Sequence, residues 1–248
     1  MKNDSLVIIP TYKESENIEA IIRAVLAQKP GFDVLVVDDG SPDGTEQIVR
    51  GMIEMPEFEE RIFILERGSK QGLGTAYIAG FKFALERDYQ YIFEMDADFS
   101  HNPEDLPKLY AACHDEGNDL SVGSRYKTGL NVVNWPLKRV LMSYFASVYV
   151  RTVLGIQVCD TTAGFVCYHR RVLETIDLDA IRFIGYAFQI EMKYTAYKCG
   201  FTIKEVPIVF VNRELGTSKM SGGIFSEALL GVVKLKLGSI GRKYPQKR

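Results

Sequence analysis

Two carboxylates, Asp96 and Asp98, stand two positions apart directly after an apolar run. In an extended chain both side chains point to one side, with their Cα atoms roughly 7 Å apart. Such like charges repel unless a cation lies between them, and hard oxygen ligands suit Mg²⁺ or Mn²⁺, with water and substrate phosphates in the remaining positions. The alternative is that one aspartate only caps the next helix, but Asn102 before Pro103 already offers that cap. The spacing therefore predicts a divalent metal site.

Basic residues accompanied by hydroxyl groups recur at three places in the second half of the chain. Arg125 follows an apolar run, and Arg139 and Ser143 lie one helical turn apart among apolar neighbours. Arg213 and Lys219 lie in a polar loop that contains glycine. Any one arginine is more often a solvated or ion-paired surface group. Three such places favour phosphate binding, because guanidinium groups match phosphate oxygens.

Several other common sites have no signature in the sequence. There is no GxxxxGK[ST] phosphate loop and no GxSxG nucleophile turn, and the three histidines show no pairing that would suggest nucleophilic catalysis. The four cysteines have no CxxC spacing, which favours reduced thiols over disulfides or a zinc site. The carboxylate pair and the basic segments remain as the candidates for chemistry.

The elements that must position these residues alternate along the first 125 residues. Apolar runs that predict strands occur at residues 6–9, 34–37, 62–65, 91–95 and 120–122. Helical periodicities lie between them, and we expect Ser41 before Pro42 to cap one of these helices. The alternation predicts an α/β fold with a mainly parallel sheet and helices on both faces. Ligands bind beyond the carboxyl ends of the strands in such sheets, which is where the candidate residues stand.

The second half of the chain has a less regular pattern. It predicts helices over residues 136–154 and 187–198, and strands over residues 164–168 and 203–211. We expect one compact catalytic domain over residues 1–223, followed by an amphipathic basic segment over residues 224–248.

Composition and charge set limits on the class of protein. With 46% hydrophobic and 25% charged residues in 248, the chain is an ordinary globular protein. No run of about 20 apolar residues predicts a membrane-spanning helix, and the first residues do not resemble an export signal. Residues 1–119 contain 24 acidic and 11 basic residues, whereas residues 120–248 contain 8 and 19. This division indicates either uneven solvated surface or a cation site in the first half and an anionic partner for the second.

Several strings in order resemble a known family. PTYKESEN, VVDDGSPDGT, MDADFSHNPEDLP and VGSRY resemble the inverting family-two glycosyltransferases of the GT-A fold, a Rossmann-like architecture. CDTTAGFVCYHRRVL, GYAFQIEMKY and VPIVFVNRELGTSKMS are similar to polyprenyl-phosphate (dolichol-phosphate) mannosyltransferases. The resemblance covers about residues 5–235, but the transmembrane helices of many members are missing.

The resemblance implies a role for individual residues. The nucleotide of the donor would be held by Pro10, Tyr12, Glu14, Val37 and Asp39. The metal and the diphosphate would be held by Asp96, Ala97 and Asp98. Donor phosphates or sugar would also contact Arg125, Arg213 and Lys219, and the acceptor phosphate would contact Arg139 and Ser143. The catalytic set would be Asp96, Asp98, Arg125 and Arg213.

The implied reaction moves mannose from GDP-mannose to a dolichyl or undecaprenyl phosphate with inversion. A phosphate monoester is largely a dianion at neutral pH, so this reaction requires no general base. One alternative is a glucosyltransferase that uses UDP-glucose. Another is an enzyme that forms an ordinary glycosidic bond, for which Glu191 is the candidate base. A non-catalytic nucleotide-sugar binding module is the third alternative, and the carboxylate pair and the arginines argue against it.

The end of the chain is basic and amphipathic. After Glu227 there is no acidic residue, and six Lys or Arg residues alternate with apolar ones. A core-packing helix with a solvated tail is one interpretation. Because a polyprenyl phosphate lies in a bilayer, we instead expect peripheral attachment to the cytosolic face of a membrane, weakened by deletion of residues 238–248. Small membrane-anchoring subunits are further candidate partners, and no nucleic-acid partner is expected.

Overall fold

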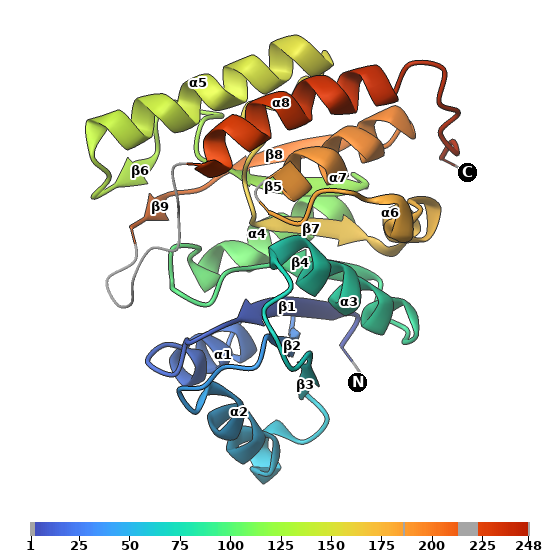
Figure 1. The fold of residues 1–248 in the computed structure, drawn as a ribbon. Helices are drawn as coiled ribbons and strands as arrows, with labels where there is room; N and C mark the ends of the chain where they lie inside the picture. Colours follow the sequence, from blue (N-terminus) through green and yellow to red (C-terminus); the bar gives the residue numbers. More distant parts are fainter. Residues whose placement is uncertain (1–2, 186, 213–222, 248) are drawn as a thin grey trace.

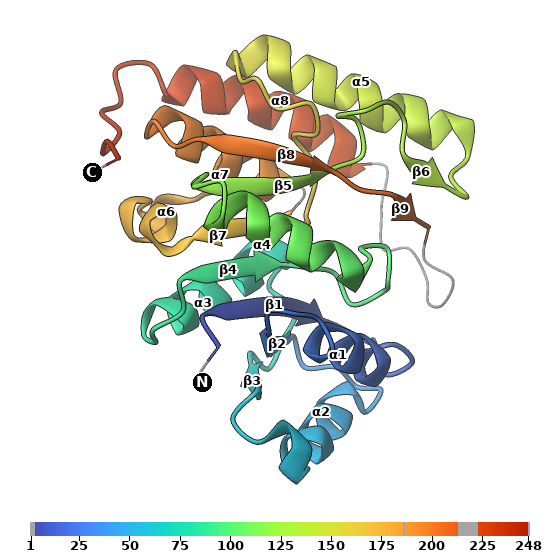
Figure 2. The same ribbon diagram turned by 180° about the vertical axis from the view of Figure 1, so that it is seen from behind.

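The centre of the molecule is a seven-stranded sheet with the strand order β3-β2-β1-β4-β7-β5-β8 (Figures 1 and 2). It belongs to a computed structural model that describes residues 3–185, 187–212 and 223–247. The strands are β1 Ser5–Thr11, β2 Asp33–Asp38, β3 Ile62–Glu66, β4 Tyr91–Glu94, β5 Leu120–Ser124, β7 Val166–His169 and β8 Ile203–Pro207. Strands β1 to β5 overlap the five predicted apolar runs, so these predictions are confirmed.

The sheet is mainly parallel, as predicted, with one antiparallel strand. β7 runs antiparallel between β4 and β5, and Val166 at its beginning is paired with Glu94 on β4 and with Val122 on β5. The residues that precede β7 therefore lie near the carboxyl ends of the parallel strands. This topology brings residues 159–165 to the edge of the sheet where ligands bind in α/β proteins.

Helices cover both faces of the sheet. One face carries α3 Leu73–Leu85, α6 Arg170–Thr175 and α7 Ala187–Lys198, with the short 3-10 helix η3 Leu178–Ala180 (Figure 1). The opposite face carries α1 Ile18–Leu26, α2 Thr45–Ile53 and α4 Leu106–His114, with 3-10 helices η1 Pro56–Phe58 and η2 Pro103–Asp105 (Figure 2). Apolar side chains alternate along the strands and form one buried cluster on each face.

Two long helices form a further layer beyond β8 (Figure 1). They are α5 Leu137–Leu154 and α8 Gly223–Gly238, next to a small ribbon of β6 Val132–Val133 and β9 Phe210–Val211. Val150 and Leu154 of α5 and Val232 of α8 belong to one buried cluster. The predicted boundary between residues 223 and 224 falls at the beginning of α8, which packs against α5 and α7. No helix in the described parts of the chain is both long and apolar enough to cross a bilayer.

Two local predictions differ from the structure. Ser41 does not cap a helix at Pro42, because α2 begins only after Gly44 and the Ser41 hydroxyl donates to the Asp38 carboxylate instead. The single strand expected over residues 203–211 is divided into β8 and β9. Pro207 ends β8, consistent with its lack of an amide hydrogen for further pairing.

Candidate active site

The loops that follow β1 and β2 are joined by a set of short hydrogen bonds. The Thr11 hydroxyl donates to Asp38 Oδ1 (2.8 Å), and the Ser41 amide and hydroxyl donate to the same carboxylate at 2.8 and 2.6 Å. The Lys13 amide in turn donates to the Ser41 hydroxyl at 3.0 Å. These contacts fix the backbone on both sides of Tyr12. Two of the predicted nucleotide-binding residues, Tyr12 and Glu14, therefore stand on a loop that these contacts hold in place, and Pro10 lies just before it in β1.

A second set of contacts continues this arrangement into the beginning of α2. Asp43 accepts hydrogen bonds from the Thr45 hydroxyl (2.6 Å) and from the Ser15 amide (3.1 Å), while the Glu14 amide donates to the Thr45 hydroxyl. Burial alone raises the pKa of Asp43, but these hydrogen bonds outweigh it and lower the pKa to about 2. The carboxylate is therefore ionised at neutral pH and holds the two loops together.

Asp39, another predicted nucleotide-binding residue, is held by an arginine that the sequence did not single out. Arg67 Nε donates to Asp39 Oδ1 at 2.7 Å, and both side chains are less than a tenth exposed. Arg67 also donates to the Thr75 hydroxyl at 2.7 Å, so the pair joins the ends of β2 and β3 to α3. Val37 lies on β2 with its side chain in the core. The one signal in the sequence that could have identified Arg67 is its position directly after β3.

A close backbone approach keeps these loops together and requires a glycine. Gly40 has a φ of 70°, and a Cβ added there would lie 2.8 Å from the carbonyl oxygen of Gly68. This separation is shorter than any ordinary van der Waals contact. The position therefore admits no side chain unless one of the two loops moves.

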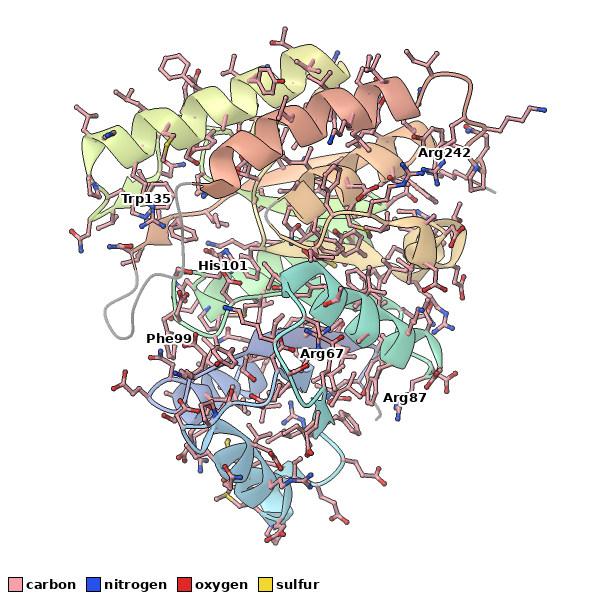
Figure 3. The ribbon with its side chains drawn as sticks, in the orientation of Figure 1. Arg67, Arg87, Phe99, His101, Trp135 and Arg242 are labelled. Atoms are coloured by element: carbon pink, nitrogen blue, oxygen red, sulfur yellow. The ribbon has the colours of Figure 1, made fainter. Side chains whose placement is uncertain are left out.

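The predicted metal ligands follow β4 in a tightly built turn. Asp98 is nearly buried, and its Oδ1 accepts from the Ser100 amide (3.1 Å) and hydroxyl (2.5 Å). Asp96 has 40% of its side chain exposed, and Ala97 between them is buried. Phe99 has a φ of 57°, in the left-handed region that non-glycine residues seldom adopt, and its side chain is exposed (Figure 3). The turn thus presents one accessible and one oriented carboxylate.

His101 is part of the framework of this turn. Its Nδ1 accepts the Asp96 amide at 3.2 Å, and its ring stacks on Phe165 with the centroids 4.9 Å apart. Burial lowers the pKa of His101 to about 4, so the ring is neutral at physiological pH. His101 is one of the three histidines for which the sequence shows no pairing. The structure shows that it supports the backbone of Asp96.

The carboxylate pair suits a metal ion that takes only some of its ligands from the protein. In the described ranges no group of three or more His, Cys, Asp or Glu side chains is arranged to hold a metal ion. Asp96 and Asp98 nevertheless provide hard oxygen ligands at the carboxyl end of β4, one of them accessible to solvent. Mg²⁺ and Mn²⁺ accept such incomplete protein sites, because water and substrate phosphates supply the other ligands.

Arg125, at the end of β5, is buried and forms a two-point ion pair with Asp160. Its Nε and Nη2 donate to the two carboxylate oxygens at 2.7 and 2.6 Å, and Nη2 also donates to the Thr162 hydroxyl at 2.9 Å. Asp160 lies in the segment that antiparallel β7 brings to this edge. Burial alone raises the pKa of Asp160, but the charge of Arg125 outweighs it and keeps the pKa below its usual range. The sequence did not identify Asp160 as the partner of Arg125.

The two predicted acceptor residues stand on α5 beside an indole ring. Arg139 lies over Trp135 with its guanidinium carbon 4.0 Å from the ring centroid, and its Nη1 donates to Asn212 Oδ1 at 2.9 Å. Ser143 accepts a hydrogen bond of 2.7 Å from the hydroxyl of Tyr126. The indole Nε1 of Trp135 is buried and has no hydrogen-bond partner among the residues that the structure describes. The predicted one-turn spacing is confirmed, and Trp135 is a neighbour that sequence reasoning missed.

Phe210 on β9 connects the acidic turn with the basic residues. Its ring centroid lies 5.4 Å from that of His101 and 5.3 Å from that of Trp135, and the Arg125 guanidinium carbon lies 5.5 Å from it. The backbone amide of Val211 also donates to the carbonyl of Ser100. Figure 3 shows His101, Phe99 and Trp135 on the same side of the molecule. The predicted metal turn and the predicted acceptor residues therefore meet at one edge of the sheet.

The remaining candidates divide into two groups. Arg213 and Lys219 lie outside the described residues. Glu191, the candidate base for an ordinary glycosidic bond, is buried on α7 and accepts the amides of Arg182 and Phe183, both at 2.9 Å. Burial raises the pKa of Glu191, although these two amides oppose the shift. The carboxylate of Glu191 thus fixes the backbone before α7, which favours a structural role over that of a base.

Comparisons with known proteins agree with this arrangement. The sequence profile of Glycosyl transferase family 2 matches residues 6–177. A polyprenol monophosphomannose synthase from Mycolicibacterium smegmatis is 47% identical over 93% of this chain and 86% of its own length. An undecaprenyl-phosphate mannosyltransferase from Micrococcus luteus is 46% identical over 94% of both chains.

Solved structures with the same fold are more distant in sequence. Glucosyl-3-phosphoglycerate synthase from Mycobacterium tuberculosis, in complex with Mn²⁺, UDP-glucose and phosphoglyceric acid, has a TM-score of 0.69 at 18% identity, covering 95% of this chain and 80% of that one. A mannosyltransferase from Pyrobaculum calidifontis, in complex with GDP-Man and Mn²⁺, has a TM-score of 0.60 at 16% identity, covering 99% and 66%. The predicted fold and family are both confirmed, and the chain belongs to glycosyl transferase family 2, with the GT-A fold.

Proposed function

We propose that this glycosyltransferase moves mannose from GDP-mannose to the phosphate of a polyprenyl phosphate, with inversion at the sugar carbon. The names of the two relatives with almost half of their residues identical support the sugar and the lipid acceptor. The structural observation that carries the proposal is the contact of Phe210 with both His101 and Trp135. It joins the carboxylate turn to a pair of arginines, as required for a reaction between two phosphate-containing substrates.

The donor side consists of the preset loops after β1, β2 and β4. Tyr12, Glu14 and Asp39 would contact the nucleotide, and Asp96 and Asp98 would hold Mg²⁺ or Mn²⁺. When bound, the metal neutralises negative charge on the diphosphate that leaves with the nucleotide. The protein's own contribution is geometric, because the hydrogen bonds to Asp38, Asp43 and Asp98 fix these loops before the donor binds.

The acceptor side is built from Arg139 and Ser143, with Arg125 between the acceptor and the donor. A phosphate monoester dianion is itself the nucleophile, so positioning and charge stabilisation suffice. His101 has its Nδ1 occupied by a backbone amide, and Glu191 has its carboxylate occupied by two amides. Neither is arranged as a base, which supports a phosphate over a sugar hydroxyl as the acceptor. Arg213 and Lys219 keep their proposed role at the donor phosphates.

The outer side of α5 and α8 supports attachment to a membrane surface. Large apolar side chains are exposed there, in a set that we call the α5–α8 face: Leu137, Leu141, Met142, Tyr144, Phe145, Leu230, Val233 and Leu237. Both helices form the outermost layer, and side chains extend from them away from the sheet (Figure 3). Lys138, Arg151 and Lys234 are exposed on the same helices, and α5 contains no acidic residue.

We propose that the α5–α8 face lies on the cytosolic surface of a membrane that contains anionic lipid. A contiguous apolar surface with basic neighbours is typical of helices that lie in the plane of the interface. Arg139 and Ser143 stand on the same helix, so an acceptor whose chain remains in the bilayer could present its phosphate to them. Small membrane-anchoring subunits remain a second proposed means of attachment.

Part of the basic tail has a partner within the protein. Lys247 Nζ is 2.7 Å from an oxygen of the buried Asp119, and the Lys247 amide donates to the carbonyl of Cys199. Deleting residues 238–248 would therefore disturb the fold as well as remove charge. The α5–α8 face offers a cleaner test of membrane binding, and the role of the tail stays a prediction.

One transfer assay tests the function. Radiolabelled GDP-mannose and UDP-glucose are offered separately, with a short water-soluble prenyl phosphate and either Mn²⁺, Mg²⁺ or excess EDTA. We expect metal-dependent transfer from GDP-mannose that also depends on the prenyl phosphate. Transfer from UDP-glucose alone would contradict the proposed donor. Nucleotide binding without transfer from either donor would favour a non-catalytic binding module.

A further inference from the structure

A fully buried lysine lies beneath the site and is not explained by the proposed reaction. Lys193 on α7 has no exposed surface. Its Nζ donates to the carbonyl oxygen of Ala163 at 2.6 Å, and to the carbonyl and Oε1 of Gln189, both at 3.2 Å. Removing an ammonium group from water is costly, so these contacts must compensate for its burial. A neutral side chain would fill the same space without that cost.

Gln189 extends this arrangement to the strand that carries the metal turn. Its Nε2 donates to Glu94 Oε2 at 2.6 Å, and the other oxygen of Glu94 accepts the hydroxyl of Tyr168 at 3.3 Å. Glu94 has no exposed surface and is two positions before Asp96. Glu94 is the last residue of β4, so the position of this strand end bears directly on the turn that follows it. Lys193, Gln189 and Glu94 therefore form a continuous connection, which we call the Lys193 bridge, that ends at the last residue of β4, two positions before Asp96.

The other end of the Lys193 bridge reaches the segment that positions Arg125. Ala163 is three residues after Asp160, which holds the Arg125 guanidinium at two points. Thr162, next to Ala163, accepts a hydrogen bond from the same guanidinium. A displacement of the Ala163 carbonyl would therefore move the support of Arg125. One helix thus contacts both the donor strand and the support of the arginine that separates the two substrates.

The charges around the Lys193 bridge explain why a lysine is tolerated there. Burial lowers the pKa of Lys193, while the negative charges of Glu94 and Asp160 oppose this shift. Glu94, which is also fully buried, provides the opposite charge at the other end of Gln189. Each group therefore makes the charged form of the other less costly. Removing either one alone leaves its partner without compensation.

We infer that Lys193 is a positioning residue, which holds the Asp96–Asp98 turn and the Arg125–Asp160 pair at a fixed separation through Gln189, Glu94 and Ala163. The inference rests on the proposed function, in which these two groups act on the donor diphosphate. Their separation decides whether the metal and the guanidinium reach the same phosphates. Small displacements of such groups reduce turnover strongly. The hydrogen bonds that define the Lys193 bridge join α7 to β4, β7 and Ala163. Arg139 and Ser143 stand on a different element, α5, so a change at Lys193 should leave the acceptor side in place.

The test compares three variants. Lys193→Met removes the charge and keeps a side chain of similar length, and Glu94→Gln with Lys193→Met removes both charges. Thr195→Val, a buried polar-to-apolar change on the same helix, is the matched control. The measurements are the melting temperature, kcat per folded enzyme, KM for a short prenyl phosphate, and the affinity for Mn²⁺ with GDP by calorimetry.

We expect Lys193→Met to lower kcat at least tenfold and to weaken Mn²⁺ binding in the presence of GDP, while KM for the prenyl phosphate stays within twofold. The double variant should regain melting temperature, because no uncompensated charge remains, but its kcat should stay low, because the Ala163 carbonyl is still not held. Thr195→Val should keep kcat within twofold.

A purely structural role predicts a different pattern. The double variant would then recover kcat together with its melting temperature, and that result would overturn the inference. If Lys193→Met does not fold, the double variant alone decides between the two outcomes. If the natural protein transfers no mannose, the proposed function fails instead, and the calorimetric comparison still tests whether Lys193 positions the metal turn.

Discussion

The loops after β1, β2 and β4 and the α5–α8 face are opposite in construction. In the loops three carboxylates, those of Asp38, Asp43 and Asp98, each accept hydrogen bonds from neighbouring amides and hydroxyls. On the α5–α8 face large apolar side chains such as Leu137 and Phe145 are 71% and 61% exposed. Because their backbone is fixed by these hydrogen bonds, the loops are suited to binding a small polar ligand of fixed shape. The face is suited to an environment that is apolar and fluid, where exact complementarity has no value.

The strongest test of this difference is at the metal turn. We expect Asp96→Asn and Asp98→Asn each to reduce transfer at least about a hundredfold, ~2.7 kcal/mol in the barrier, because each removes a charged ligand. The melting temperature should change little for Asp96→Asn, since 40% of this side chain is exposed. Steady-state transfer rates and thermal unfolding are the measurements. Asp88→Asn, at an exposed position before β4, is the control.

Full activity in both aspartate variants, or transfer that continues in excess EDTA, would show that the turn does not hold a metal needed for the reaction.

The acceptor side should respond through a different parameter. Arg139→Ala removes charge-assisted contacts, which are worth about 1.5–3 kcal/mol, so KM for the prenyl phosphate should rise roughly ten- to a hundredfold. GDP binding should remain near normal, because the donor loops are built from other elements. Lys138→Ala, the exposed neighbour, serves as the control. Loss of GDP binding with an unchanged KM would reverse the assignment of the two sides.

The α5–α8 face should matter for membrane binding and not for the chemistry. Phe145→Asp should reduce sedimentation with anionic vesicles about tenfold, since burying one large apolar side chain is worth ~1.5–3 kcal/mol. Binding should also weaken as salt rises, because the basic neighbours are screened. Tyr197→Asp, at an exposed aromatic residue on α7, is the control. If both variants bind vesicles like the natural protein, the comparison between the two regions fails.

The smallest effect is expected at the tail. Lys247→Met removes one partner of the buried Asp119, and a partly exposed ion pair contributes below about 1 kcal/mol. Burial raises the pKa of Asp119, but Lys247 and Thr202 outweigh it and lower the pKa below the usual value. A lowered carboxyl pKa stabilises the fold above the unfolded-state value and loses this effect as pH falls.

The difference in melting temperature between Lys247→Met and the natural protein should therefore be largest at neutral pH and disappear in acid. Vesicle binding should change less than in Lys234→Met, because Lys234 is exposed on α8 and Lys247 is paired. A variant that lost vesicle binding and kept its melting temperature would make the tail part of the membrane-binding surface after all.

The sequence predicted what depends on residues close to one another in the chain. The strands, α5 and α7 follow from the spacing of apolar residues, and Asn102 accepts the Glu104 amide as expected of a cap. The acidic turn and the Arg139–Ser143 spacing lie within single elements. These predictions succeed because the interactions that decide them are local.

The supports of the site depend on distant partners and could not be predicted. Gln189 and Glu94 are 95 positions apart, and Arg125 and Asp160 are 35 apart. The cap prediction for Ser41 failed for a local reason instead, because the carboxylate of Asp38, three positions earlier, accepts the Ser41 hydroxyl. Lys193 has the sequence neighbours of an ordinary helix residue. Its burial becomes visible only when β7 is placed antiparallel, since that brings Ala163 over α7.

The late position of α8 in the chain has a consequence for biosynthesis. Val150 and Leu154 on the inner side of α5 obtain part of their cover from Val232, which is made after a further stretch of roughly 70 residues. At a rate of roughly 5–20 residues per second, a growing chain carries α5 for roughly 4–14 s before its partner emerges. During that interval α5 exposes apolar side chains on both its inner and its outer side. A ribosome that stops before residue 223 would therefore release a polypeptide that needs chaperones or is degraded.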